Sequence, residues 1–179
     1  MKAVPTILNQ CFVIEPTVFN DSRGYFFESF NQETFNTLIG QSVTFVQDNE
    51  SYSTKGVLRG LHFQNGEWAQ AKLVRVVKGR VLDVAVDIRK ESPTYGQHFS
   101  IELTEDNKKQ LFVPRGFAHG FVVLSDTAIF SYKCDNYYNK ASEGGIMYND
   151  ATLNINWKLP IEALIISEKD TVLPTFETI

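Results

Sequence analysis

The chain has 179 residues, a formal net charge of −4 at pH 7, 43% hydrophobic residues and 21% charged residues. This composition is typical of a folded globular protein and excludes wholesale disorder, while the acidic balance argues against a general nucleic-acid binder. At roughly 100–200 residues per domain, the length predicts a single domain spanning residues 1–179.

The first elements in chain order are an edge strand and a short helix. Segment 21–30, DSRGYFFESF, has a charged residue on each side of an aromatic trio and predicts an edge strand with a charged rim. Asn31 precedes QETFNTLI and Gly40 follows it, and these residue types are typical caps of the two helix ends. The pattern therefore predicts a helix of about two turns.

The middle of the chain consists of alternating apolar segments. In residues 72–89, apolar side chains recur with a period of two, which predicts half-buried strands on either side of a hairpin turn at Lys78-Gly79. Other segments with strand character follow the same pattern or are short and apolar: 57–64, 99–103, 111–114, 120–125 and 127–134. After Pro160, residues 159–170 predict one or two helical turns. The sum is an all-β domain, a sandwich or a barrel, with small helical additions.

The sequence also predicts the cellular compartment of the protein. No apolar run approaches the roughly 20 residues that a membrane-spanning helix needs, so we expect no membrane association. Asn9 and Gln10 interrupt the apolar run near the N-terminus, which is therefore a poor signal peptide. Cys11 and Cys134 are too few for a secreted disulfide framework and predict buried thiols in a cytoplasmic protein.

Candidate functional residues lie within the strand-like segments. Arg59 and His62 sit among apolar residues of VLRGLHFQ, where a cation and an imidazole need partners or a purpose. The alternative is an edge arginine and a histidine satisfied within the core. In SYKCDNYY at 131–138, the Tyr132 phenol could donate a proton and the Tyr138 ring could stack on a base or sugar. The alternative for both tyrosines is a structural role.

A metal site is weighed and set aside. Segment 113–121, VPRGFAHGF, has the pattern P-x-G-x-x-H, which matches the second half of the metal-binding cupin pattern and directs His119 into a barrel. The alternative is a plain turn with a buried histidine bonded to the backbone. The first half of the cupin pattern offers H-x-H, but here His62 is followed by Phe63 and Gln64, so one ligand is missing. His98 lies in a different strand, and the sequence predicts no metal.

Taken together, the segments resemble the dTDP-4-dehydrorhamnose 3,5-epimerase family, which are metal-free cupins. The matching segments run in the family's order from near residue 19 to residue 170: DSRGYFFESF, FVQDNESYSTKGVLRGLHFQ, QAKLVRVVKGRVLDVAVDIRKESPTYG, QLFVPRGFAHGFVVLS, YKCDNYY and SEKD. The resemblance implies a cupin-type jelly-roll barrel with short peripheral helices and no cofactor. It also implies a homodimer in which N-terminal strands cross to the partner.

The resemblance further implies the chemistry. The family epimerises nucleotide-linked 4-keto-6-deoxy sugars, in which the C4 ketone acidifies the C–H bonds at C3 and C5. By resemblance His62 is the base and Asp170 in SEKD is the carboxylate that orients it. Tyr132 is the acid on the opposite face of the sugar, and Lys72 stabilises the C4 oxyanion.

The same resemblance implies residues that hold the dTDP part of the substrate. Arg59 suits a diphosphate oxygen, Gln47 and Asn49 offer neutral hydrogen bonds, Tyr138 stacks on the thymine or a sugar face, and His119 lines the site. The partner subunit's strand would lend the remaining three residues: Arg23, Phe26 and Glu28.

Bland alternatives stand beside these roles. Arg23 and Glu28 could form only a surface ion pair, and Tyr138 could be packing. Asp87 and Arg89 match the family's VDIR motif but read better as a structural charge pair outside the site.

Competing functions remain beside the leading one, a cofactor-free 3,5-epimerase that feeds dTDP-L-rhamnose synthesis. An epimerase acting at C3 alone, or a related isomerase of another nucleotide-linked 4-keto-6-deoxy sugar, would carry the same residues. A metal-dependent cupin oxygenase is opposed by Gln64. A non-catalytic sugar-nucleotide binding module would not need His62, Tyr132 and Asp170 together.

Overall fold

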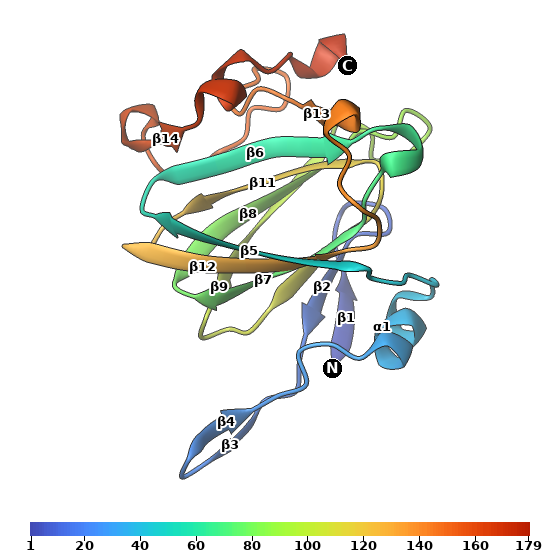
Figure 1. Ribbon diagram of the computed structural model, residues 1–179, viewed down its shortest axis with the longest axis vertical. Coiled ribbons are helices and arrows are strands. Elements are labelled where there is room, and N and C mark those ends of the chain that lie inside the picture. The colour runs from blue at the N-terminus through green and yellow to red at the C-terminus, as the bar shows by residue number, and fades with distance from the viewer.

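Two facing β-sheets form the body of the protein in the computed structural model, which describes all 179 residues (Figure 1). Sheet I has the strand order β1 (Lys2–Pro5), β2 (Phe12–Glu15), β10 (Gln110–Val113), β7 (Lys72–Lys78), β12 (Thr127–Cys134) and β5 (Gln47–Thr54). Sheet II has the order β13 (Glu143–Gly145), β6 (Val57–Gln64), β11 (Phe117–Val123), β8 (Arg80–Asp87) and β9 (His98–Thr104), and β14 (Ile165–Ile166) pairs with β6. This arrangement confirms the expected all-β jelly roll.

Helical segments are short and peripheral, as expected. Helix α1 (Gln32–Ile39) begins at Asn31, whose side chain accepts a hydrogen bond from the Thr34 amide at 3.0 Å, and ends at Gly40 in the left-handed conformation. Single 3₁₀ turns make up the rest: η1 (Gly66–Trp68), η2 (Lys140–Ser142), η3 (Ile161–Ala163), η4 (Glu168–Val172) and η5 (Phe176–Thr178). None of these helices has the length and apolar character needed to cross a membrane.

Consecutive strands often lie in different sheets, and this overturns one expectation. The hairpin predicted at Lys78-Gly79 is wrong, because β7 belongs to sheet I and β8 to sheet II, and the chain crosses between the sheets at Gly79. Gly79 has φ 80°, and an added Cβ would lie 2.1 Å from the Thr127 carbonyl oxygen. Alternating apolar residues followed by a glycine turn occur both at a hairpin and at a crossing between two sheets. Which of the two forms depends on where each strand is buried.

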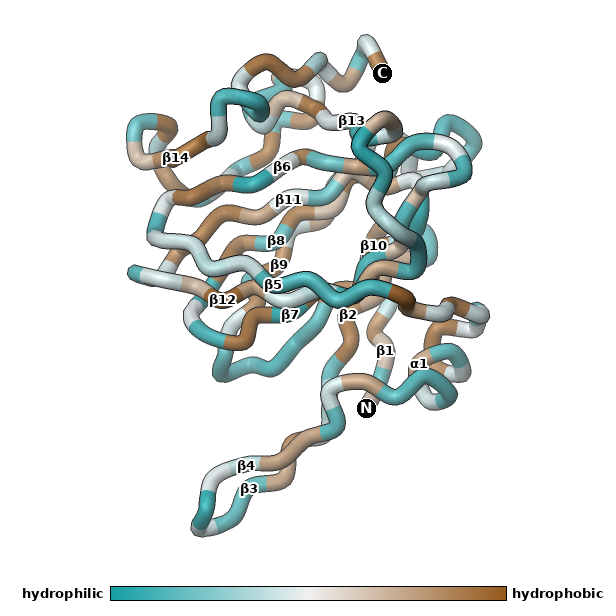
Figure 2. The backbone as a smooth tube through the Cα atoms, viewed as in Figure 1, coloured by the Kyte–Doolittle hydropathy of each residue, from teal (hydrophilic) through white to brown (hydrophobic).

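Apolar layers explain why strand β8 is buried from Val81 to Asp87, although the sequence predicted a half-buried strand. Val81 and Ala85 face the core between the sheets. Leu82, Val84 and Val86 face outward, but the C-terminal segment covers them with side chains that include Ile146, Leu153 and Trp157. Helix α1 covers sheet I in the same way, packing Phe35 and Ile39 on residues of β2, β7 and β10. Figure 2 shows the resulting hydrophobic stretches along β8, β11 and β12.

An arm projects from the body of the protein. Strands β3 (Phe19–Asp21) and β4 (Gly24–Phe26) pair only with each other and extend away from both sheets (Figure 1). The prediction of an edge strand over 21–30 is therefore wrong, because residues 21–26 belong to a separate hairpin. Phe26 is 70% exposed and Tyr25 is 57% exposed. The arm thus offers aromatic side chains that its own chain does not cover.

Candidate active site

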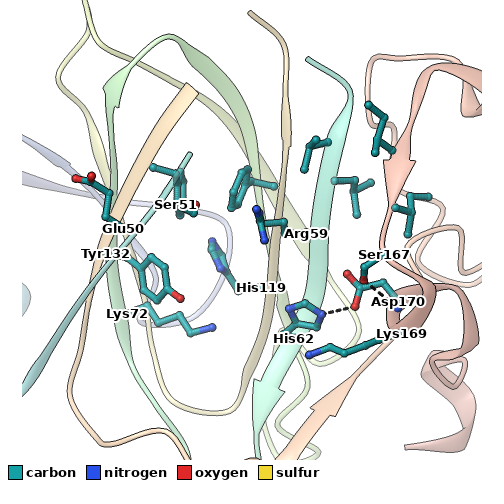
Figure 3. A pocket seen from close by; sticks show the side chains of 16 residues that line it. Glu50, Ser51, Arg59, His62, Lys72, His119, Tyr132, Ser167, Lys169 and Asp170 are labelled. Atoms are coloured by element: carbon teal, nitrogen blue, oxygen red, sulfur yellow. Dashed lines mark hydrogen bonds and ion pairs between the residues drawn. The ribbon is translucent and has the colours of Figure 1, made fainter. Parts of the chain in front are cut away.

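A cavity of about 600 Å³ opens between the two sheets (Figure 3). Its polar lining includes residues of both sheets and of the C-terminal segment: Glu50, Ser51, Arg59, His62, Lys72, His119, Tyr132, Ser167, Lys169 and Asp170. A second cavity of about 300 Å³ shares His62, Lys72 and Tyr132 with the first. The two cavities therefore meet at three of the four residues that the resemblance assigns to catalysis.

The fourth of these residues pairs with His62. The Nε2 atom of His62 lies 2.7 Å from Oδ1 of Asp170, and the Asp170 side chain is only 3% exposed. Ser167 caps η4 by accepting from the Asp170 amide, and the Gly60 amide donates to Oδ2 of Asp170 at 3.4 Å. Burial by itself raises the pKa of Asp170, but the hydrogen bond and charge of His62, together with hydrogen bonds from Gly60 and Ser167, hold that pKa below its usual range. The pair can orient and charge an imidazole base.

A local irregularity places Arg59 and His62 on the same wall. Residues three apart in a regular strand point to opposite faces. Here the register between β6 and β11 shifts between His119 and Phe121, and both side chains line the cavity. Gly60 and Gly120 allow the close approach, because a Cβ added to Gly60 would lie 2.5 Å from the Gly120 Cα.

Tyr132 and Lys72 form the opposite wall, on neighbouring strands β12 and β7. Figure 3 shows both side chains across the cavity from His62 and Asp170. The Lys72 Nζ lies 5.9 Å from the centroid of the Tyr132 ring. Burial raises the pKa of the Tyr132 phenol, so it keeps its proton at neutral pH, and burial lowers the pKa of the Lys72 ammonium. One wall thus carries an imidazole paired with a carboxylate, and the other carries a phenol and an amine.

His119 also lines the main cavity, but the plain-turn alternative for it is wrong. Its Nε2 atom bonds to the carboxylate of Asp83 on β8, at 3.0 Å and 3.1 Å from the two oxygens, and not to the backbone. Sequence reasoning gave Asp83 neither a partner nor a role. No group of three His, Cys, Asp or Glu side chains is arranged to hold a metal ion.

The predicted nucleotide-binding residues divide between the two cavities. Arg59 lines the larger cavity, where its Nε donates to the Ser53 hydroxyl at 3.2 Å. Gln47, Asn49 and Tyr138 line the smaller cavity, and Gln47 donates to Asn49 at 3.0 Å. All four lie within reach of a ligand that spans both cavities.

Two residues of this region escaped sequence reasoning. Glu143 on β13 accepts a hydrogen bond from the Tyr138 hydroxyl at 2.9 Å and forms an ion pair with Lys169 on η4. This contact joins the two cavities at their rim. The only sequence signal was the position of Lys169 within SEKD, because Glu143 lies in a segment without a motif.

The remaining three predicted binding residues do not join the cavity of their own chain. Arg23 and Phe26 lie on the arm, and Glu28 follows it. Arg23 pairs with Asp21 at 2.6 Å, so the alternative of an ion pair between Arg23 and Glu28 is wrong. Glu28 accepts instead from the Asn31 side chain at 3.3 Å.

Comparison with known proteins places the chain among relatives of one kind. The sequence profile of the dTDP-4-dehydrorhamnose 3,5-epimerase family matches residues 5–178. The chain belongs to this family. The epimerase of Salmonella typhimurium is 55% identical over 178 residues, which cover 99% of this chain and 96% of the relative. The chain is accordingly an isomerase of the dTDP-4-dehydrorhamnose 3,5-epimerase family.

Solved structures of family members agree with the fold of this epimerase. The crystal structure of the enzyme from Elizabethkingia anophelis matches with a TM-score of 0.97 and 58% identity, covering 99% of this chain and 97% of that one. The enzyme from Legionella pneumophila, in complex with dTDP-4-keto-L-rhamnose, matches with a TM-score of 0.95 and 47% identity, covering 99% and 94%. These matches confirm the cupin jelly roll for this epimerase.

Proposed function

We propose that the protein inverts C3 and C5 of dTDP-4-dehydro-6-deoxy-D-glucose to give dTDP-4-dehydro-L-rhamnose, a step of dTDP-L-rhamnose biosynthesis. The observation that carries the proposal is the placement of a His–Asp pair and a buried phenol on opposite walls of one cavity. Epimerisation needs a base on one face of the sugar and an acid on the other. The names and high identity of the relatives support the same reaction.

The proton transfers follow from this placement. His62 removes the proton from C3 or C5, and Asp170 stabilises the imidazolium that forms. The electron pair of the C–H bond moves into an enolate, whose C4 oxygen accepts a hydrogen bond from the Lys72 ammonium. Tyr132 then donates its phenolic proton to the opposite face of the same carbon. Proton exchange with solvent restores the imidazole and the phenol, so that the net change is inversion.

The remote nucleotide would position the sugar for both transfers. Arg59 and Lys169 are cations that line the main cavity and suit the diphosphate. Gln47 and Asn49 offer amide groups in the smaller cavity, where the Tyr138 ring suits stacking on the thymine.

Incubation with dTDP-4-dehydro-6-deoxy-D-glucose in D₂O tests the function directly. We expect NMR to show deuterium at both C3 and C5 and product with both centres inverted. Label at C3 alone would assign the protein to the C3-only epimerases instead. Label at neither carbon would contradict an epimerase of this substrate.

We further propose a homodimer in which each arm completes the partner's site. The arm exposes both Phe26 and Arg23, and neither lines the cavity of its own chain. Exposed aromatic side chains are typical of an interface between subunits, and a cation on the same arm suits a charged ligand in the partner's site. The exchanged arm would bring the three remaining binding residues, Glu28 included, to the substrate.

Subunit mixing tests the exchange of arms. In a dimer of one Arg23→Ala and one His62→Ala chain, one site would combine an intact His62 with an intact arm. We therefore expect mixing of the two weakly active variants to restore part of the wild-type activity. Activity that stays at the level of the separate variants would contradict a shared site.

Catalysis is expected to need no metal or other cofactor. The acid–base scheme uses only side chains of this protein. Gln64 occupies the position at which a metal-binding cupin has its second histidine. Exhaustive treatment with a chelator should leave turnover unchanged. Loss of turnover that one divalent ion restores would contradict the scheme.

The setting proposed for this activity is the cytoplasm, with residues 1–179 acting as one domain. Cys11 and Cys134 are both unpaired and buried, as predicted, and this suits a reducing compartment.

A further inference from the structure

A second histidine–carboxylate pair lies beside the first. In the antiparallel register of β6 and β11, His119 is directly opposite His62. Such cross-strand neighbours have Cβ atoms about 4.5–5.5 Å apart. His119 lines the cavity, whereas its partner Asp83 is not among the lining residues and is 0% exposed. Asp83 therefore acts on the cavity only through other groups.

The geometry fixes the state of the His119 ring. Both carboxylate oxygens of Asp83 lie within 3.1 Å of Nε2. A carboxylate only accepts hydrogen bonds, so this nitrogen carries a proton and the ring is held in one orientation. Phe130 stacks on the ring, with centroids 6.2 Å apart and planes at 25°. His119 thus presents a rigid edge at the level of the catalytic base.

Asp83 also influences the charge of the opposite wall. Burial lowers the pKa of Lys72, and the negative charge of Asp83 is among the groups that oppose this lowering. A buried carboxylate destabilises the fold unless other groups compensate it, so a fully buried carboxylate bonded to a histidine of the cavity calls for a purpose.

We propose that Asp83 is a positioning residue for the epimerisation: it holds His119 in one tautomer and one orientation at the sugar. The proposal rests on the proposed function. The competing view is that Asp83 and His119 only stabilise the core between the sheets.

The chain offers a matched control in Asp87. This residue lies on the same strand, is also 0% exposed and also forms a buried pair, with Arg89 at 2.7 Å, as the sequence predicted. Its pair lies outside both cavities of the site. Asp87→Asn therefore removes a comparable buried charge that has no contact with the chemistry.

Steady-state kinetics of the two variants separate the views. We expect Asp83→Asn to lower kcat and deuterium wash-in at both carbons by about 10²-fold while KM stays within about 3-fold, because a His119 ring that is free to turn no longer supports the proton transfers at the sugar. Asp87→Asn should lower the unfolding temperature and leave kcat unchanged. If Asp83→Asn resembles Asp87→Asn, or if its defect lies in KM alone, the positioning role is wrong.

Wild-type protein decides the question if Asp83→Asn does not fold. In ¹⁵N-labelled protein we expect the His119 proton on Nε2 throughout the pH range of activity, and an unprotonated Nε2 overturns the proposal. Wild-type wash-in at C3 and C5 is measured in parallel. Its absence would remove the proposed function itself, whereas normal wild-type wash-in with an unaffected Asp83→Asn would remove only the role of Asp83.

Discussion

His62→Ala is expected to abolish deuterium exchange at both C3 and C5. In the proposed mechanism the same imidazole serves both carbons, and the other histidine of the cavity, His119, has its Nε2 atom bonded to Asp83. Loss of a general base commonly lowers a rate by about 10²–10⁴-fold. Exchange is measured by NMR as deuterium wash-in from D₂O. Near-normal wash-in at either carbon would remove His62 from the base role at that carbon.

Two further variants control this experiment. His98→Ala changes a histidine on β9 that lies outside both cavities of the site, so its wash-in should equal that of the wild type. Asp170→Asn keeps the shape of the His62 partner and deletes its charge. We expect this variant to fold and bind dTDP but to exchange slowly, because the amide stabilises neither the tautomer nor the imidazolium.

Tyr132→Phe is expected to separate proton removal from inversion. The substitution keeps the ring and its packing against Phe130 but deletes the phenolic proton, which burial keeps in place at neutral pH. Removal of a proton by His62 survives, so wash-in at C3 or C5 remains measurable. Net inversion falls, most at the carbon whose reprotonation depends on Tyr132, and the family resemblance indicates C5.

The measurement compares wash-in with product configuration in the same NMR sample. Tyr52→Phe is the matched control, because this tyrosine lies on β5 opposite Ile129 and is 62% exposed. It should leave both quantities at wild-type values. If wash-in and inversion fall in equal proportion at both carbons in Tyr132→Phe, then Tyr132 binds the substrate and is not the acid.

Local features of the fold were predictable from the sequence. Strand β6 occupies residues 57–64, as the sequence indicated, and α1 lies between its two predicted caps. These features depend on interactions within a few residues: the period of two of a strand, an N-cap side chain and a glycine at the helix end. The same local patterns exposed His62 and Tyr132 as polar residues in apolar surroundings.

Local sequence patterns could not predict which residues these side chains contact. The separation of His62 from Asp170 is 108 positions, and only the family resemblance linked them. Glu143 gave no signal at all, because its contacts with Tyr138 and Lys169 come from a loop and a C-terminal turn that only the fold brings together.

The sequence by itself determined most strands between residues 57 and 134, where the helix begins and ends, and which residue types carry the chemistry. Only the tertiary structure decided that Gly79 is a crossing between sheets, and that Arg59 and His62 share one wall. The physical reason is that alternation fixes the two faces of a strand but not what covers each face. Burial of both faces of β8 and the register shift beside Gly60 depend on segments far away in the chain, which no local pattern contains.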